Sequence, residues 1–362
     1  KLFNKAPAGE QASDLARLGD WARWLGRRSD ARDYYDQAWR RITPPPEAVA
    51  GAEPEPPNNP SPEGDAADDI AIYISPDGAN ELVIIGTNKK YGLETYNSNG
   101  KRLFHAPFGR INNVDLLKGF KPSEKGALAL LGGSNRTHLS VDFWHLNAND
   151  SITLQKRIKT ELSDVYGFTF YSDSKATYAF VSDKKGTLLQ YQLFFGGDDT
   201  FEVSLIRKIK FSSVVEGIEA DPKRGLVLAA QENKGLWKFN AHPFMPLDKK
   251  LVLSVDRKDL KADLEGVALL ERDQSRDLIF ISVQGSNSYA ILDAQDYLLK
   301  GIFKIVQGET AIDGAEETDG IEVSWITQEE GLFIAQDGFN DGETQNFKFV
   351  KLSTILSQLD KI

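Results

Sequence analysis

The sequence of 362 residues contains no cysteine, one methionine and four histidines. Without cysteine the chain has no disulfide framework, no thiolate metal site and no cysteine nucleophile. No apolar stretch reaches the roughly 18 residues that cross a bilayer, so we expect no membrane span. Ser134 and Ser286 have no histidine partner in any recognisable arrangement, which disfavours covalent catalysis through serine.

The chain also lacks an excess of basic residues. It has 43 lysines and arginines against 53 aspartates and glutamates, a formal net charge of −10 at pH 7. This balance argues against general nucleic-acid binding, but an anionic ligand remains compatible with a local basic patch or a bound metal. A hydrophobic content of 41% agrees with a globular protein that has a large core.

Residues 1–46 have the pattern of a small α-helical hairpin. Apolar residues follow helical spacing after Ser13, Gly26 ends this first helix, and a second helix stops before the prolines at 44–46. The pattern resembles a single tetratricopeptide repeat; the alternative is an incidental hairpin. Because one hairpin cannot bury its own face, its aromatic residues should pack on the propeller or mediate self-association: Trp21, Trp24, Tyr34, Tyr35 and Trp39.

Residues 47–64 are rich in Pro, Ala, Glu and Asn and show no hydrophobic periodicity. This composition indicates an extended linker between the hairpin and a main domain over residues 65–362. We therefore expect residues 1–64 to be dispensable for catalysis.

A polar residue precedes a short hydrophobic strand six times in the main domain, about every 50 residues. Such a period, with several short strands in each copy, is typical of propeller blades. A β-sandwich is disfavoured because the repeat is sixfold and visible in the sequence. We predict an all-β protein with a six-bladed β-propeller, and the aligned polar residues are Asp69, Asn113, Tyr166, Glu216, Glu265 and Asp319.

Charged residues should converge at one end of this propeller. The innermost strands line the central axis, and four of the six aligned residues are carboxylates, which repel one another unless cations lie between them. Blades one to three add a cationic arc of Lys89, Lys90, Arg110, Arg136 and Lys184. Blades four to six add an acidic arc, with Asp68 and Asp69 across the seam and Gln284 in blade five: Glu216, Glu232, Asp263, Glu265, Asp313, Asp319 and Asp337.

These residue types predict a metal and phosphate site. Oxygen ligands without cysteine or clustered histidine favour a hard cation, with calcium first. Lysine and arginine facing such ions suit a phosphate that bridges both. Water activated by the metal would then hydrolyse a phosphomonoester. Each residue could instead be a solvated turn residue or a strand cap, but their shared position in successive blades favours a common site.

Ten motifs between residues 65 and 352 resemble the β-propeller phytases, calcium-dependent alkaline enzymes. Among them are DAADDIAIY (65–73), TNKKYGLETY (87–96), VEGIEAD (215–221), DLEG (263–266) and ETDGIEV (317–323). The resemblance implies a 3-phytase-type phosphoric monoester hydrolase. It would bind several calcium ions and convert phytate (myo-inositol hexakisphosphate), free or as its calcium complex, to lower inositol phosphates and inorganic phosphate by direct attack of calcium-activated water.

The resemblance also assigns residues to roles. The expected phosphate ligands are Lys89, Lys90, Arg136 and Lys184, with Arg110 added from its place in the cationic arc. The expected catalytic residues are Asp68, Tyr166, Glu216, Glu232, Asp263 and Glu265. The metal ligands that the resemblance implies are Asp68, Asp69, Tyr166, Glu216, Glu232, Asp263, Glu265, Asp313 and Asp319. We add three further expected metal ligands: Gln284, Gly314 and Asp337.

Two other functions remain open. A calcium-dependent lactonase or esterase propeller would also have axial carboxylates, but it has no use for a cationic arc. A non-catalytic calcium-binding propeller would keep the fold. We expect no nucleic-acid or membrane partner, and a secreted or periplasmic bacterial location, although this chain begins at Lys1 without a signal peptide.

Overall fold

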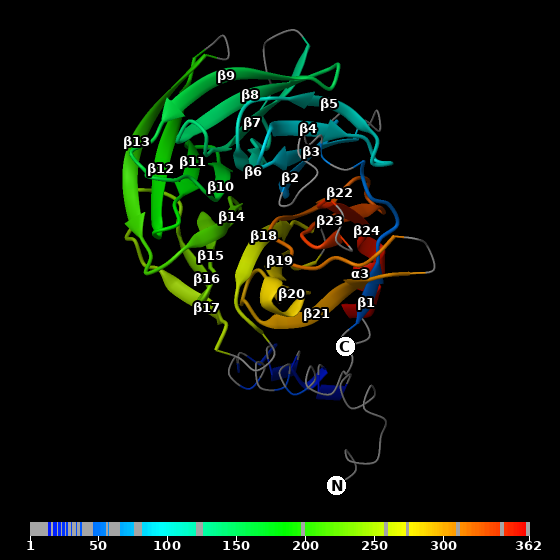
Figure 1. Cartoon of the computed structure of the whole chain (residues 1–362). Helices are drawn as coiled ribbons and strands as arrows, with labels where there is room; N and C mark the ends of the chain where they lie inside the picture. Colours follow the sequence, from blue (N-terminus) through cyan, green and yellow to red (C-terminus); the bar gives the residue numbers. More distant parts are fainter. Residues whose placement is uncertain are drawn as a thin grey trace.

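The computed structural model of the chain describes residues 46–55, 57, 66–75, 82–120, 126–196, 200–256, 260–272, 275–308, 312–340 and 344–359, with scattered residues between 14 and 37. Six β-sheets surround a central axis as the blades of a propeller (Figure 1). The prediction of an all-β, six-bladed propeller is confirmed. Within these ranges, no helix has the length and apolar character needed to cross a membrane.

Each blade is an antiparallel meander that runs from the axis to the rim (Figure 1). Blade one contains β2 (Ala67–Ile74), β3 (Leu82–Asn88), β4 (Gly92–Tyr96) and β5 (Arg102–Ala106). Blade two contains β6 (Ile111–Leu116), β7 (Ala127–Asn135), β8 (Ser140–Asn147) and β9 (Ile152–Lys159). Blade three contains β10 (Phe168–Ser172), β11 (Thr177–Ser182), β12 (Thr187–Phe195) and β13 (Phe201–Lys210).

The second half of the ring repeats this plan. Blade four contains β14 (Val215–Asp221), β15 (Leu226–Gln231), β16 (Gly235–Asn240) and β17 (Lys250–Ser254). Blade five contains β18 (Leu264–Leu270), β19 (Leu278–Val283), the short helix η2 (Gln284–Ser286), β20 (Ser288–Asp293) and β21 (Leu299–Val306). Blade six contains β22 (Ile321–Trp325), β23 (Gly331–Asp337) and β24 (Asn346–Lys351), and helix α3 (Leu352–Leu359) follows it.

Buried apolar side chains fill the spaces between neighbouring blades, in six clusters among the described residues. Phe280 of β19 illustrates the packing, because its ring centroid lies 6.4 Å from that of Phe303 in its own blade and 5.5 Å from that of Phe333 in blade six. Burying such side chains supplies about 1.5–3 kcal/mol each. The blades are therefore joined face to face, which fixes the inner strands around the axis.

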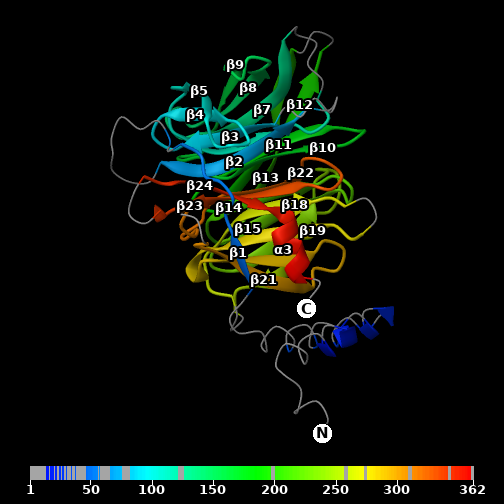
Figure 2. The same cartoon turned by 90° about the vertical axis from the view of Figure 1, so that its right-hand side faces the viewer.

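The segment before β2 belongs to the propeller. Strand β1 (Glu47–Val49) pairs in parallel with β21 as a fifth strand of blade five. Ala52 then forms an antiparallel bridge to Phe349 of β24, and α3 contacts β1 (Figure 2). The prediction that residues 47–64 form a linker is therefore wrong for residues 47–55. This segment pairs with strands far along the chain, so no local periodicity marks it.

Most of the predicted helical hairpin lies outside the described residues, and its tetratricopeptide character stays a prediction. The described helical residues near Trp21 lie outside the ring of blades (Figures 1 and 2). Trp21 and Trp24 are 72% and 84% exposed. The expectation that these two side chains pack on the propeller is therefore wrong in this structure, and self-association through them stays a prediction.

Candidate metal and phosphate site

A β-bulge near the start of an inner strand decides which side chain faces the site. In β2 the pairing with β3 shifts between Ala67 and Ile70, so that Asp68 and Asp69 together oppose Thr87. The same shift occurs in β6, β14 and β18. A bulge re-aims a side chain and is frequent beside functional sites. The first bulge residue is polar in all four strands: Asp68, Asn112, Glu216 and Glu265.

This register corrects the alignment of the repeats in blades one and two. The second bulge residue is a glycine in blades four and five, whereas it is Asp69 in blade one and Asn113 in blade two. The sequence alignment that puts Asp69 and Asn113 in the ring is therefore wrong by one position. In blades three and six the ring residue is the one that precedes a glycine, namely Tyr166 and Asp319. The ring therefore consists of Asp68, Asn112, Tyr166, Glu216, Glu265 and Asp319.

The glycines that follow ring residues permit close approach between blades. A Cβ atom on Gly217 would lie 2.0 Å from the carbonyl oxygen of Glu265, and one on Gly320 would lie 2.4 Å from that of Asp68. The amide of Gly320 donates to the same Asp68 oxygen at 3.0 Å, which joins the last blade to the first. The backbone thus holds successive ring residues close together.

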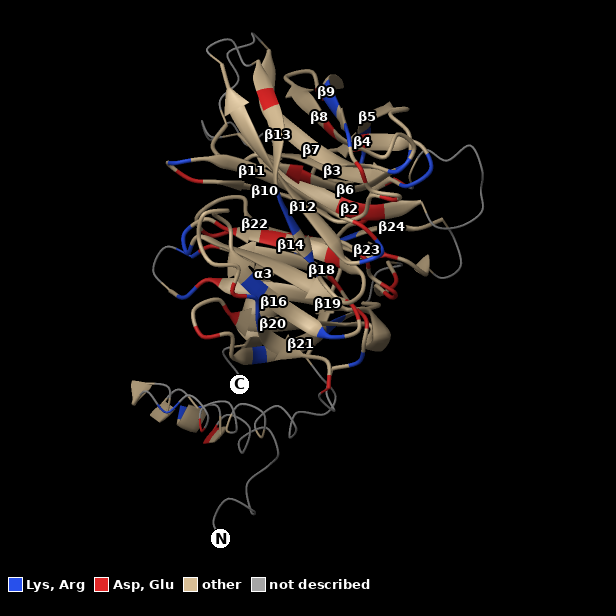
Figure 3. Cartoon of the chain, turned by 90° about the vertical axis from the view of Figure 1, so that its left-hand side faces the viewer, with Lys and Arg blue, Asp and Glu red and all other residues tan. Residues whose placement is uncertain are grey.

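Three glutamates form a carboxylate cluster on the acidic side of the ring. Figure 3 shows the strands and loops of the blades with their Asp and Glu residues in red and their Lys and Arg residues in blue. One oxygen from each of Glu216, Glu232 and Glu265 lies within 4.8 Å of the others. Burial, with the charge of Glu216, raises the pKa of Glu265 well above its usual value. Burial and the charges of Glu216 and Asp263 raise the pKa of Glu232 to about 7. Carboxylates this close cannot all be charged unless cations lie among them.

Asp68 is a buried carboxylate that accepts no hydrogen bond from the described residues. It is 1% exposed, and both of its oxygens lack a donor. The Nζ atom of Lys89 lies 3.5 Å from Asp68 Oδ1 and donates to Asp319 Oδ2 at 3.0 Å. Burial raises the pKa of Asp68 well above its usual value, and the Lys89 charge opposes this shift. Gln284 Nε2 donates to the other oxygen of Asp319 at 2.7 Å.

The cationic side of the ring is built on Tyr166 and Asp164. Arg136 donates from Nε and an Nη atom to the two oxygens of Asp164, at 3.2 and 3.1 Å. The Nζ atom of Lys184 lies 4.2 Å from the centroid of the Tyr166 ring, which is a cation–π distance. Burial, followed by the Glu216 charge, raises the pKa of Tyr166, so its hydroxyl stays protonated. Arg136 and Lys184 therefore lie close to the acidic cluster: Asn112 contacts both Arg136 and Glu216, and the Lys184 charge opposes the rise in the pKa of Glu232.

Four predicted residues lie at the edges of this arrangement. Lys90 and Arg110 are exposed. Asp263 is half-buried, and its charge contributes to the raised pKa of Glu232. Asp69 lines a small pocket between the inner strands, and its Oδ2 atom accepts hydrogen bonds from Asn113 Nδ2 at 3.0 Å and from the Val114 amide at 3.1 Å.

Three further predicted metal ligands lie apart, at the seam of blades five and six. Here the Nζ atom of Lys348 contacts Asp313, Asp337 (3.2 Å), Glu53 (2.7 Å) and the side-chain oxygen of Asn340 (2.9 Å). The Lys348 side chain is fully buried. An ammonium group thus sits among the carboxylates that the sequence analysis assigns to a metal, and Gly314 adjoins them. The structure does not bring these three residues to the ring.

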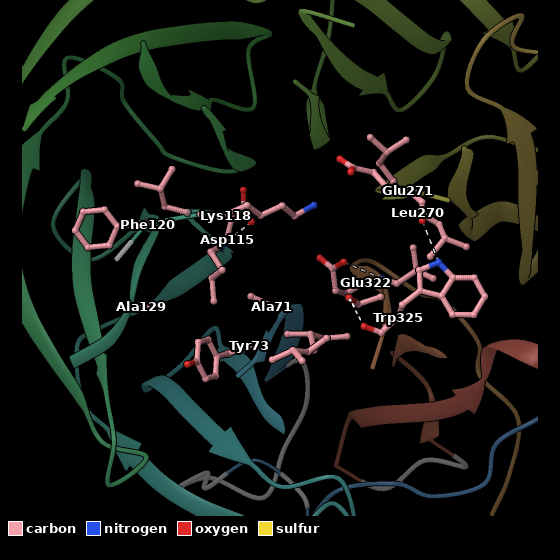
Figure 4. A pocket seen from close by; sticks show the side chains of 18 of the residues that line it. Ala71, Tyr73, Asp115, Lys118, Phe120, Ala129, Leu270, Glu271, Glu322 and Trp325 are labelled. Atoms are coloured by element: carbon pink, nitrogen blue, oxygen red, sulfur yellow. Dashed lines mark hydrogen bonds between the residues drawn. The ribbon is translucent and has the colours of Figure 1, made fainter. Parts of the chain in front are cut away.

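A pocket of about 400 Å³ lies at the opposite end of the inner strands, where β2, β6, β18 and β22 end. Figure 4 shows Lys118 extending toward Glu271 and Glu322, with Asp115 and Trp325 also on the wall. Burial raises the pKa of Glu322 to about 7. This pocket contains none of the residues predicted for the site.

Sequence reasoning missed three residues that shape these clusters. Asn112 belongs to the ring, and the NNV motif would have revealed it had the alignment been shifted by one residue. Asp164 orients Arg136 but lies in a loop without a repeated pattern. Lys348 lies in the alternating strand NFKFVK, where a lysine ordinarily indicates an exposed face.

Comparison with known proteins agrees with this architecture. A family model described as Phytase matches residues 46–362, which begin just before β1. A 3-phytase of Bacillus subtilis (strain 168) is 35% identical over 318 residues, or 82% of this chain and 82% of that protein. A crystal structure of BBS1N in complex with ARL6DN, soaked with lead, has a TM-score of 0.46 and 9% identity over 83% of this chain and 98% of that one, which is too low to carry an argument. On the strength of the family match and the identity to the Bacillus protein, the chain belongs to the phytase family.

Proposed function

We propose that this protein hydrolyses phytate, myo-inositol hexakisphosphate, to lower inositol phosphates and inorganic phosphate, and that it requires calcium. Membership of the phytase family and the 35% identity to a 3-phytase support phytate as the substrate and a 3-phytase-type phosphoric monoester hydrolase as the class of enzyme. The calcium requirement rests on the chemistry of the ring.

The observation that carries the metal proposal is the environment of Asp68. Its two buried oxygens accept no hydrogen bond from the described residues, and Lys89, 3.5 Å from Oδ1, faces Asp319 as well as Asp68, so the carboxylates outnumber this cation. Glu265 Oε2 is a third buried oxygen without a hydrogen-bond donor, and a bound cation would compensate all three. The neighbouring oxygens come from carboxylates, so they suit a hard cation that takes six to eight oxygen ligands. Asp68, Glu216, Glu232, Glu265 and Asp319 would hold calcium, with Asp263, Tyr166 and Gln284 beside them.

The cationic residues support a phosphate ester as the ligand. Lys89 lies directly beside the ring carboxylates Asp68 and Asp319, and Arg136 and Lys184 lie beside Asn112 and Tyr166 of the same ring. All three cations would bind the phosphate oxygens. A bound calcium ion would neutralise charge on the phosphate and make a water molecule more acidic. Lys90 and Arg110 at the exposed edge would contact other phosphates of the substrate.

Direct attack by water is favoured over a serine nucleophile. The Ser134 hydroxyl is fully buried, donates to the carbonyl oxygen of Tyr166 and accepts from the Asn113 amide at 3.1 Å. Both hydrogen bonds of this hydroxyl are therefore made with backbone groups of blades two and three, which leaves it in no position to attack a substrate. Single turnover in isotopically labelled water, with a substrate chiral at phosphorus, should give one labelled oxygen in the released phosphate with inversion at phosphorus. Retention would indicate a phosphoenzyme and contradict direct attack.

A substrate panel tests the proposal against its rivals. The calcium-loaded protein should release phosphate from phytate and should leave a γ-lactone and an aryl acetate intact. Hydrolysis of the lactone or acetate without phosphate release would favour a lactonase or esterase. Inertness toward all three substrates, in a folded protein that binds calcium, would favour a non-catalytic propeller.

We also propose a secreted or periplasmic location, because calcium sites of micromolar to millimolar affinity are saturated outside the cytosol. Fractionation of the native cells checks this. Recovery of the protein only from the cytosol would contradict it.

A further inference from the structure

Asn112 joins the acidic and cationic sides of the ring. Its Nδ2 atom donates to Glu216 Oε1 at 2.9 Å, and its Oδ1 atom accepts from an Nη atom of Arg136 at 3.3 Å. The residue is fully buried, so neither contact competes with bulk water. Asn112 occupies the bulge position that carries a carboxylate in blades one, four and five.

From this geometry we infer that Asn112 is a positioning residue, a neutral spacer that holds Glu216 in the carboxylate cluster while leaving the charge of Arg136 available for phosphate. The inference rests on the proposed function, since it assumes that phosphate binds at Arg136. Nothing in the sequence pattern or in the family match assigns this role to residue 112.

The choice of an amide follows from the charges around it. An aspartate here would form an ion pair with Arg136, and that arginine already shares its charge with Asp164. It would also place a carboxylate beside Glu216, in a cluster that is already acidic. An amide donates to one neighbour and accepts from the other without changing the charge of either.

Three variants test the spacer role. Asn112→Asp keeps the shape and adds the charge, Asn112→Ser removes both contacts and stays neutral, and Arg136→Met removes the cation. We expect Asn112→Asp to weaken the binding of inorganic phosphate to the calcium-loaded protein, and to raise KM for phytate, by about tenfold, the effect of one charge-assisted hydrogen bond. Asn112→Ser should weaken phosphate binding less, but should lower kcat because Glu216 is no longer held.

Gln190 supplies a matched control. It is a fully buried amide whose Oε1 atom accepts from Arg207 Nε at 2.7 Å and whose Nε2 atom donates to the Ala241 carbonyl oxygen at 2.7 Å, on the outer part of blade three. Gln190→Glu makes the same chemical change beside an arginine. It should leave phosphate affinity and KM unchanged, whatever it does to the melting temperature.

A double-mutant cycle of Asn112→Asp and Arg136→Met, measured by calorimetric titration of inorganic phosphate, tests whether the effect of residue 112 on phosphate affinity depends on Arg136. In the Arg136→Met background, Asn112→Asp should cost at most about twofold in phosphate affinity, because the charge that it neutralises is already absent. A full tenfold effect in that background, equal losses for Asn112→Asp and Asn112→Ser, or tighter calcium binding with unchanged phosphate affinity would overturn the inference. Intact coupling in a protein that releases no phosphate from phytate would instead contradict only the proposed function.

Discussion

The Nζ atom of Lys89 lies 3.0 Å from Oδ2 of Asp319, a residue 230 positions away along the chain. The contact joins the loop after β3 in blade one to the residue just before β22 in blade six. The same ammonium group lies 3.5 Å from Asp68, so one lysine faces two ring carboxylates at the seam where the propeller closes. A phosphate bound beside Lys89 would therefore lie next to carboxylates that we propose as metal ligands.

Replacement of Lys89 by glutamine should lower kcat/KM for phytate by between about tenfold and a hundredfold, because one charge-assisted hydrogen bond to phosphate is lost. Steady-state kinetics at saturating calcium measures this. Lys175→Gln is the matched control, since Lys175 is exposed in the turn between β10 and β11 at the other end of the blade. An unchanged kcat/KM in Lys89→Gln would remove this lysine from the site.

Replacement of Glu265 by glutamine should change the melting temperature in opposite directions with and without calcium. Glu265 is buried and one of its oxygens has no donor, so in the metal-free protein either its charge or its protonation is unfavourable. The amide avoids both costs and should raise the melting temperature in chelator by roughly 2 °C or more. The same variant should melt below the wild type in saturating calcium, because a ligand is lost.

Thermal scans of the Glu265→Gln variant need an ordinary glutamate for comparison. Glu202 of β13 has an 85% exposed side chain. Glu202→Gln should leave the calcium-induced rise in melting temperature unchanged. A Glu265→Gln variant that keeps the whole rise would show that Glu265 is no metal ligand.

Lys348 should stabilise the fold whether or not calcium is present. Its buried ammonium group contacts Glu53, Asp313 and Asp337, and removal of one partner from such a buried cluster costs about 3–5 kcal/mol. Urea unfolding of Lys348→Met should show this loss of free energy equally in calcium and in chelator. If calcium restored the free energy of unfolding of this variant, the cluster of Glu53, Asp313 and Asp337 would bind a metal ion when the lysine is absent.

Two N-terminal truncations should distinguish residues that the propeller needs for stability from residues that it does not need. Deleting residues 1–44 should leave folding and phytate hydrolysis intact. Deleting residues 1–57 removes β1, the buried residues Ala48 and Ala50 and the Glu53 partner of Lys348, so the melting temperature should fall sharply. Equal melting temperatures for the two truncated proteins would contradict the role of β1 in blade five.

The metal-free protein should lose stability as the pH rises from about 4.5 to about 7. Burial raises the pKa of Glu232 and of Glu322 to about 7 in the folded state, from 4.5. The folded chain therefore binds these protons more tightly than the unfolded chain, and stability falls as they are released. Urea unfolding of metal-stripped protein across this window measures the trend, and Glu322→Gln should flatten it. Stability that rises with pH would contradict these shifts.

The repeats made the fold and most of the ring predictable, because blades three to six carry a polar residue followed by glycine and an apolar strand. In blades one and two Asp69 and Asn113 replace that glycine, and two adjacent polar residues leave the register open. Only the bulges show that Asp68 and Asn112 face the site. Strand β1 and Lys348 were not predictable, since both depend on pairing between residues roughly 250 to 300 positions apart.

Phosphate release from phytate, followed while calcium is withdrawn and then returned, tests the central claim most directly. The protein should release phosphate from phytate in calcium, and release should stop when a chelator removes the ion. Release should resume when calcium is restored in excess, and circular dichroism should show a folded protein throughout. Release that continues undiminished in chelator would contradict a metal-dependent ring, and absence of release in calcium would contradict phytate hydrolysis itself.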